Sequence, residues 1–182
     1  MYALEIKPTS FCLGKCWFCC DKDNRCVDIS TSQFLKNLRT VVYELQQKEL
    51  ISNYYISGGE PTSRPKRLQG TLEILKELKC YPLSMTTNGY KLQECRDYIL
   101  DSGIKNITIS RHDTLGKEIV NAPSNQSLKR TMETMEKIDF SFNIVLQKST
   151  KVKDMILTAE LFPVKSITFL QLSDVKGTSI IP

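Results

Sequence analysis

The 182-residue chain lacks the features that mark membrane and secreted proteins. No apolar run approaches the roughly 20 residues that a membrane-spanning helix needs. The first residues, Met1 to Lys7, lack the long apolar segment of a signal peptide. The sequence also contains no internal repeat, low-complexity linker or composition shift that would mark a domain boundary. We therefore expect one domain over residues 1–182, located in the cytoplasm and not in a membrane.

Dense positive charge is also missing. The net charge is +5, but no basic stripe with interleaved aromatic residues is present, which argues against nucleic-acid binding. The charge fits a lysine-rich solvated surface, or contact with an acidic electron-transfer partner or an anionic substrate. With 41% hydrophobic and 25% charged residues, the composition is that of an ordinary globular protein. The chain is long enough to bury a core without covalent cross-links.

Cysteines are concentrated near the N-terminus. Of seven in the chain, Cys12, Cys16 and Cys19 fall within eight residues. Their density and the expected compartment argue against a disulfide framework, whereas closely spaced thiolates can converge on one soft metal centre. A closed zinc or iron–sulfur site wants four ligands, so three cysteines on a 4Fe–4S cube leave one iron open for chemistry. A site closed by Cys20 or Cys26 is the alternative.

Strand and helix patterns alternate along the chain. This alternation predicts a parallel sheet with right-handed crossover helices. The first helix has an apolar face that includes Leu38, Val41 and Val42. Period-2 and period-3.6 patterns predict strands over residues 2–7, 54–57, 82–87, 106–110, 140–146 and 166–172, and helices over 31–45, 66–79, 93–101, 126–137 and 152–161.

Unusual polar segments follow the first four predicted strands. They are the cysteine loop, Gly58 to Pro61, Thr86 to Gly89, and Ser110 to Asp113. Because the carboxyl ends of parallel strands share one edge of a sheet, functional groups should gather there.

The cysteine motif resembles the signature of the radical S-adenosylmethionine (radical SAM) superfamily, Cys-x3-Cys-x2-Cys with an aromatic residue before its last cysteine. Gly58-Gly59-Glu60-Pro61 matches the second motif of that superfamily. Thr86-Thr87-Asn88-Gly89 is similar to a segment of enzymes that look like the GTP cyclase of molybdopterin biosynthesis. The resemblance spans Leu4 to about Leu172 and implies an α/β fold, a partial parallel (β/α)6 barrel open on one side.

The resemblance implies a 4Fe–4S cluster on Cys12, Cys16 and Cys19, with the methionyl amine and carboxylate of S-adenosylmethionine on the fourth iron. An electron from the reduced cluster, supplied by a partner such as flavodoxin or ferredoxin, cleaves S-adenosylmethionine to methionine and a 5′-deoxyadenosyl radical. That radical removes hydrogen from a substrate. A partner protein or a second copy of the chain could close the open barrel.

We expect a small-molecule substrate, in cofactor, nucleoside or natural-product biosynthesis. A peptide or protein substrate, including a glycyl-radical enzyme to be activated, is the alternative within the enzyme class. A non-enzymatic iron–sulfur electron carrier or a structural metal module is the alternative of another class, and a catalytically inactive scaffold is a third.

The resemblance also suggests which residues contact S-adenosylmethionine. Gly58 and Gly59 let backbone approach the cofactor without a Cβ, and Glu60 meets the methionyl ammonium. Thr87 and Asn88 lie beside the cofactor in the third-strand loop. The alternative is that the two glycines only form a turn.

Residues further along the chain complete this set. Ser110 is expected at the carboxylate or ribose of the cofactor, Asn143 and Gln171 at the ribose and adenine, and Phe18 over the adenine. The alternative for Ser110 and Asn143 is that they form hydrogen bonds only with neighbouring backbone.

Three further sequence features have more than one interpretation. Arg111 is a candidate contact to a carboxylate. His112, the only histidine, is a candidate substrate contact or proton carrier, or a solvated loop residue. Cys80 and Cys95 are expected to be buried or incidental thiols.

Overall fold

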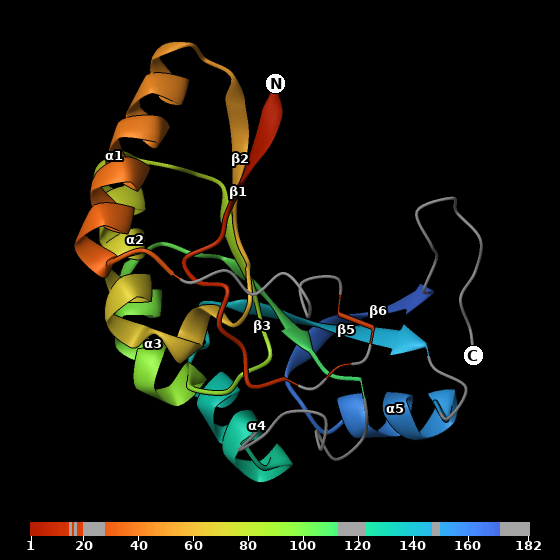
Figure 1. Ribbon diagram of the computed structural model, residues 1–182. Helices are drawn as coiled ribbons and strands as arrows, with labels where there is room; N and C mark the ends of the chain where they lie inside the picture. Colours follow the sequence, from red (N-terminus) through yellow and green to blue (C-terminus); the bar gives the residue numbers. More distant parts are fainter. Residues whose placement is uncertain (15, 17, 20–27, 113–122, 147–149, 172–182) are drawn as a thin grey trace.

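Six parallel strands form a single sheet in the order β1-β2-β3-β4-β5-β6 (Figure 1). The computed structural model describes residues 1–14, 16, 18–19, 28–112, 123–146 and 150–171. Each strand pairs in parallel with its neighbour in the sequence. The strands are β1 (Tyr2–Ile6), β2 (Ile51–Ile56), β3 (Leu83–Thr87), β4 (Asn106–Ser110), β5 (Asp139–Leu146) and β6 (Val164–Gln171).

A helix connects each described pair of neighbouring strands. The helices lie along the convex side of the curved sheet and leave its other face open to view (Figure 1). They are α1 (Thr31–Gln47), α2 (Pro65–Glu77), α3 (Leu92–Asp101), α4 (Asn125–Glu133) and α5 (Val152–Ala159), with a short 3-10 helix η1 (Pro61–Ser63) after β2. This arrangement confirms the predicted partial barrel. Among the described residues, no helix combines the length and apolarity needed to cross a membrane.

Alternation along the strands separates an apolar face from a polar one. In β4, Ile107 and Ile109 are fully buried against the helices, whereas Thr108 and Ser110 on the opposite face are partly exposed. Two consecutive strand residues point to opposite sides of a sheet, so this pattern places the core under the helices. Met132 and Met135 belong to that core.

Several predicted boundaries differ from the observed ones. β2 begins at Ile51, three residues earlier than predicted, because pairing with Tyr2 of β1 carries the strand through two polar residues. α4 ends at Glu133, not at residue 137, because the chain then turns, with Met135 N–H donating to the carbonyl of Met132. Val41, on the predicted apolar face of α1, is 47% exposed, since it lies at the edge of the apolar stripe of that helix.

Candidate functional site

The segment that leaves β1 is held against the segment that leaves β2. We call residues 8–11, just before the first cysteine, the stem of the cysteine loop. Gly59 N–H donates to the carbonyl of Thr9 at 2.9 Å, and Glu60 N–H donates to the carbonyl of Phe11 at 2.8 Å. The Gly-Gly-Glu segment therefore continues the β1–β2 pairing and fixes where the cysteine loop starts.

Gly58 and Gly59 make this close approach possible. Gly58 has φ +119°, a conformation that residues with a side chain rarely adopt. A Cβ on Gly59 would lie 2.5 Å from the carbonyl oxygens of both Ser10 and Phe11. The space beside Gly59 is thus filled by the stem of the cysteine loop. A second role for these glycines, next to a cofactor, stays a prediction.

Glu60 is the centre of a buried hydrogen-bond network. One carboxylate oxygen accepts from Thr62 N–H at 3.0 Å, Thr62 Oγ1 at 2.6 Å and Thr87 Oγ1 at 2.5 Å. The other accepts from Asn88 N–H at 2.7 Å. Burial raises the pKa of Glu60, and the hydrogen bonds from Thr62, Thr87 and Asn88 oppose that rise. The network joins the ends of β2 and β3, and contact with a methionyl ammonium stays a prediction.

Asn88 connects this network to the first cysteine. Its Oδ1 accepts from Tyr90 N–H at 3.0 Å, which orients the amide, and its Nδ2 lies 3.8 Å from Cys12 Sγ. Cys12 Sγ also accepts from Gly14 N–H at 3.1 Å. The sulfur therefore already receives two N–H donors, and hydrogen bonds to sulfur tune iron–sulfur centres.

The first two cysteines face a common point beside Gly14. A Cβ on Gly14 would lie 3.1 Å from Cys12 Sγ and 3.6 Å from Cys16 Sγ. Cys19 follows at once, with its N–H donating to the carbonyl of Cys16 at 3.1 Å and its side chain exposed. All three are free thiols, so the donor chemistry fits an iron–sulfur cluster.

Convergence of the three sulfurs on one point is not seen. In the described part of the chain, no group of three or more histidine, cysteine, aspartate or glutamate side chains is arranged around a metal site. Cys20 and Cys26, the alternative fourth ligands, lie outside the described residues. Cys80 and Cys95 are buried in the core, as expected, and burial raises the pKa of Cys95 to about 12.

His112 and Phe18 lie against each other beside the cysteine loop. Their ring centroids are 4.8 Å apart in an edge-on arrangement. His112 Nδ1 accepts from Val145 N–H at 3.1 Å, so the ring bridges the end of β5 and the cysteine loop. The structure therefore places His112 against protein groups, which differs from a solvated loop residue.

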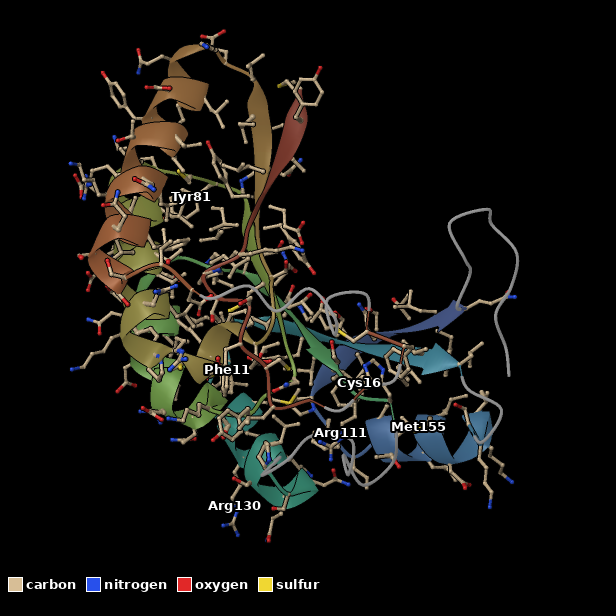
Figure 2. The ribbon with its side chains drawn as sticks, in the orientation of Figure 1. Phe11, Cys16, Tyr81, Arg111, Arg130 and Met155 are labelled. Atoms are coloured by element: carbon tan, nitrogen blue, oxygen red, sulfur yellow. The ribbon has the colours of Figure 1, made fainter. Side chains whose placement is uncertain are left out.

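Arg111 points toward α4. Its side chain is buried, and its Nη2 donates to Asn125 Oδ1 at the start of that helix. The backbone N–H of Arg111 donates to the carbonyl of Asn143 at 2.9 Å. Figure 2 shows Arg111 and Cys16 near the ends of β4 and β5, with Tyr81 at the far side of the molecule. Carboxylate binding by Arg111 stays a prediction.

Ser110 and Asn143 are neighbours across β4 and β5 and are both partly exposed. Gln171 is exposed at the end of β6, two strands from Ser110. Ser110 and Asn143 belong to a polar face, opposite the helices, on which hydroxyl groups pair across strands: Tyr55 with Thr86, and Thr108 with Ser141 at 3.1 Å. Gln171 does not belong to this face, because it lies on the same side of β6 as Ile167 and Phe169, which pack against the core. The open side of the sheet is therefore lined by hydrogen-bonding groups.

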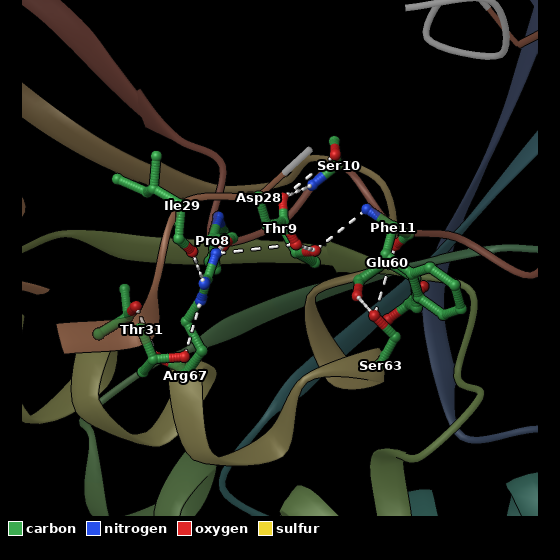
Figure 3. Close-up of polar contacts among 11 residues, drawn as sticks. Pro8, Thr9, Ser10, Phe11, Asp28, Ile29, Thr31, Glu60, Ser63 and Arg67 are labelled. Atoms are coloured by element: carbon green, nitrogen blue, oxygen red, sulfur yellow. Dashed lines mark hydrogen bonds and ion pairs between the residues drawn. The ribbon is translucent and has the colours of Figure 1, made fainter. Parts of the chain in front are cut away.

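Asp28 and Arg67 are two polar residues near the cysteine loop that sequence patterns did not reveal (Figure 3). Asp28 accepts from the N–H and hydroxyl groups of Ser10, and Arg67 donates to the carbonyl of Pro8. The sequence shows that both residues are charged and have apolar neighbours. It does not show that they contact backbone groups, because every residue carries these groups.

Comparisons with known proteins show the family of the chain. A family model of the radical SAM superfamily matches residues 6–162. GTP 3′,8-cyclase from Staphylococcus haemolyticus is 27% identical over 190 residues, covering 94% of this chain and 54% of that protein. A probable GTP 3′,8-cyclase from Thermococcus kodakarensis is 27% identical over 182 residues, covering 96% of this chain and 57% of that protein.

Solved structures share the fold. Streptococcus suis SuiB bound to the precursor peptide SuiA has a TM-score of 0.72 at 20% identity, covering 99% of this chain and 41% of that chain. The anSMEcpe structure with bound AdoMet has a TM-score of 0.67 at 20% identity, covering 92% of this chain and 50% of that chain. These likenesses support the fold alone.

The chain spans about half the length of the curated relatives it matches. Radical SAM proteins use a 4Fe–4S cluster and S-adenosylmethionine, and bound S-adenosylmethionine is present in structural neighbours. Because the family model covers most of the sequence, from the end of β1 to the turn after α5, the chain belongs to the radical SAM superfamily.

Proposed function

We propose that this chain catalyses reductive cleavage of S-adenosylmethionine followed by hydrogen abstraction from a polar substrate. The observation that carries the proposal is the cysteine triplet at the carboxyl end of β1, held against the Gly-Gly-Glu segment, with Asn88 directed at Cys12 Sγ. When bound, a 4Fe–4S cluster supplies the electron that breaks the sulfur–carbon bond of S-adenosylmethionine.

Residues of the chain support this chemistry. Cys12, Cys16 and Cys19 are the proposed cluster ligands, and Asn88 and Gly14 N–H donate to the first of these sulfurs. Glu60 is a positioning residue, because its carboxylate holds the backbone of Asn88. Phe18 and His112 pack on each other beside the loop.

Binding of S-adenosylmethionine is assigned to the polar rim around this loop. The proposed contacts are the backbone near Gly58 and Gly59, and the side chains of Thr87, Ser110 and Asn143. A contact from Gln171, at the end of β6 and off the polar face, stays a prediction. Ser110 and Asn143 are partly exposed on the same face. Thr87 Oγ1 already donates to Glu60 and accepts from Gly89 N–H at 3.0 Å, so one remaining lone pair is what it offers to a ligand.

A small polar molecule is the proposed substrate class. Its support is the face of paired hydroxyl groups on β2 to β5, because each hydroxyl can both donate and accept a hydrogen bond. Curated relatives are named GTP 3′,8-cyclase, which agrees with a nucleotide-like molecule for this chain. Electrons would come from a small redox protein such as a flavodoxin or ferredoxin.

The proposal is tested by product analysis. Anaerobically reconstituted protein is incubated with dithionite and S-adenosylmethionine, and 5′-deoxyadenosine is measured. The wild-type protein should form it, the Cys16→Ser variant should not, and the Cys80→Ser variant, which changes a thiol buried in the core, should behave as wild type. Absence of 5′-deoxyadenosine from cluster-loaded wild type would refute the proposed chemistry.

Substrate class is tested by isotope transfer. Deuterated nucleosides, nucleotides and short peptides are added in turn, and deuterium in 5′-deoxyadenosine identifies the molecule that loses hydrogen. Transfer from a nucleoside or nucleotide supports the small-molecule proposal. Transfer from peptides alone would replace it with the peptide-modifying alternative.

A further inference from the structure

Both ends of the cysteine loop meet at one buried arginine on α2. Arg67 is 7% exposed, and Figure 3 shows it between the segment that leaves β1 and the segment that enters α1. Its Nη1 donates to the carbonyl of Pro8 at 2.9 Å, and its Nη2 donates to the carbonyl of Ile29. Its Nε donates to Thr31 Oγ1 at 3.3 Å. One guanidinium therefore contacts the residues on either side of the loop.

Asp28, at the end of the cysteine loop, contacts the residues at the start of the loop. Its Oδ1 accepts from Ser10 N–H at 3.0 Å and from Ser10 Oγ at 3.1 Å, and its Oδ2 accepts from Thr9 Oγ1. Arg67 Nη1 lies 3.7 Å from Asp28 Oδ2. The contacts of Asp28 with Ser10 and Thr9 join residues 18 and 19 positions apart in the sequence, and all three cysteines of the motif lie between them.

The chemistry of this junction fits an arginine and not a lysine. The planar guanidinium presents donors in fixed directions, which suits two carbonyls and a hydroxyl on different segments. Its flat face also lies over the Phe34 ring, 5.3 Å from the ring centroid. A lysine would bring the charge but not the fork, so it would reach fewer of these acceptors.

We propose that Arg67 and Asp28 form a clasp that sets the spacing of the two ends of the cysteine loop and thereby positions its thiols for the cluster. Both are positioning residues, since no hydrogen bond or ion pair joins either of them to a cysteine in the described part of the chain. Bringing the two ends of a loop together lowers the entropy of the chain. The contacts of Arg67 and Asp28 offset this loss before any iron binds. The inference rests on the proposed cluster but assigns residues outside the family's motifs.

The test measures how firmly the cluster is held, not turnover. Wild type, Arg67→Met, Arg67→Lys and Asp28→Asn are reconstituted anaerobically, and the rate at which a ferrous-iron chelator removes iron is followed by absorbance. Arg39→Met is the matched control, because Arg39 makes an exposed pair with Glu77, the last residue of α2. All measurements are made well below the unfolding temperature of each cluster-free variant.

Arg67→Met should release iron at least tenfold faster than wild type, Asp28→Asn several-fold faster, and Arg67→Lys at a rate between wild type and Arg67→Met. Arg39→Met should match wild type. The electron paramagnetic resonance line shape of the reduced cluster should broaden in Arg67→Met and Asp28→Asn only, a signature that a general loss of stability does not produce. Asp28→Asn and Arg67→Lys retain the test if Arg67→Met does not fold.

Two results overturn the inference. If folded Arg67→Met and Asp28→Asn release iron at the wild-type rate with an unchanged spectrum, the clasp does not position the thiols, while the proposed function stands. If wild type itself takes up no iron, the proposed function fails and the clasp inference fails with it.

Discussion

Replacing Gly59 by alanine should destabilise the protein before any cofactor binds. The new Cβ would lie 2.5 Å from the carbonyl oxygens of Ser10 and Phe11, and 2.6 Å from the carbonyl carbon of Ser10. These are backbone atoms of the stem, so relief requires the stem to move. If Gly59 served only to admit a cofactor, the same substitution would leave the cofactor-free protein unchanged.

The size of the effect follows from two opposing terms. Overpacking a well-packed site costs ~1–3 kcal/mol, whereas alanine restricts the unfolded chain and returns ~0.4–1 kcal/mol. The middle of each range gives a net loss of about 1.3 kcal/mol. For a chain of this length, each kcal/mol shifts the melting temperature by ~2–4 °C, so we expect a decrease of roughly 3–5 °C.

The assay is thermal unfolding of purified, iron-free protein, followed by circular dichroism. Gly70→Ala is the control, because Gly70 lies inside α2 and its Cβ would meet the movable Cδ1 of Leu35 at 2.5 Å. Alanine gains ~1 kcal/mol of helix propensity there, so its melting temperature should be equal to or above that of wild type. A Gly59→Ala protein as stable as Gly70→Ala would refute the packing argument.

Three further outcomes are expected. Asn88→Leu should lower the reduction potential of the cluster, because it removes an N–H donor to Cys12 Sγ. Loss of a hydrogen bond of ~1 kcal/mol corresponds to roughly 40 mV for transfer of one electron. Redox titration without S-adenosylmethionine measures this shift, and an unchanged potential would contradict the prediction. Burial tends to raise the pKa of Asp28, but hydrogen bonds and the Arg67 charge outweigh burial and hold that pKa below its ordinary 3.8. This stabilisation is present above pH 3.8 and is lost as pH falls through the pKa of the folded state. In urea unfolding, Asp28→Asn should therefore lower the free energy of unfolding by ~1–3 kcal/mol at neutral pH and by less near pH 3. A difference between wild type and variant that increased in acid would contradict this prediction. Single serine variants of Cys20 and Cys26 should keep their iron, and loss of the cluster in either would favour a four-cysteine closed site.

Much of the fold could be predicted because its signals are local. Apolar alternation marks strands such as β4, and Gly-Gly-Glu-Pro stops β2 abruptly, so alternation of helices and strands implied a parallel sheet. The start of β2 could not be predicted, because pairing with β1, not the character of Ser52 and Asn53, extends it.

The site was predicted in part, for a similar reason. Glu60 and Asn88 were expected at the rim because they follow neighbouring strands. That four donors already engage the Glu60 carboxylate depends on how the ends of β2 and β3 meet. Arg67 was missed because two of its acceptors are carbonyls of Pro8 and Ile29, and every residue carries a carbonyl.

Binding of S-adenosylmethionine to an open iron is tested most directly by the electron paramagnetic resonance spectrum of the reduced, reconstituted protein with and without S-adenosylmethionine. A cluster of roughly four irons held by three cysteines has one iron open to a ligand, so adding S-adenosylmethionine should change the spectrum, and a Cys16→Ser variant should show neither the cluster nor the change. A loaded wild-type cluster whose spectrum is identical with and without S-adenosylmethionine would contradict the account.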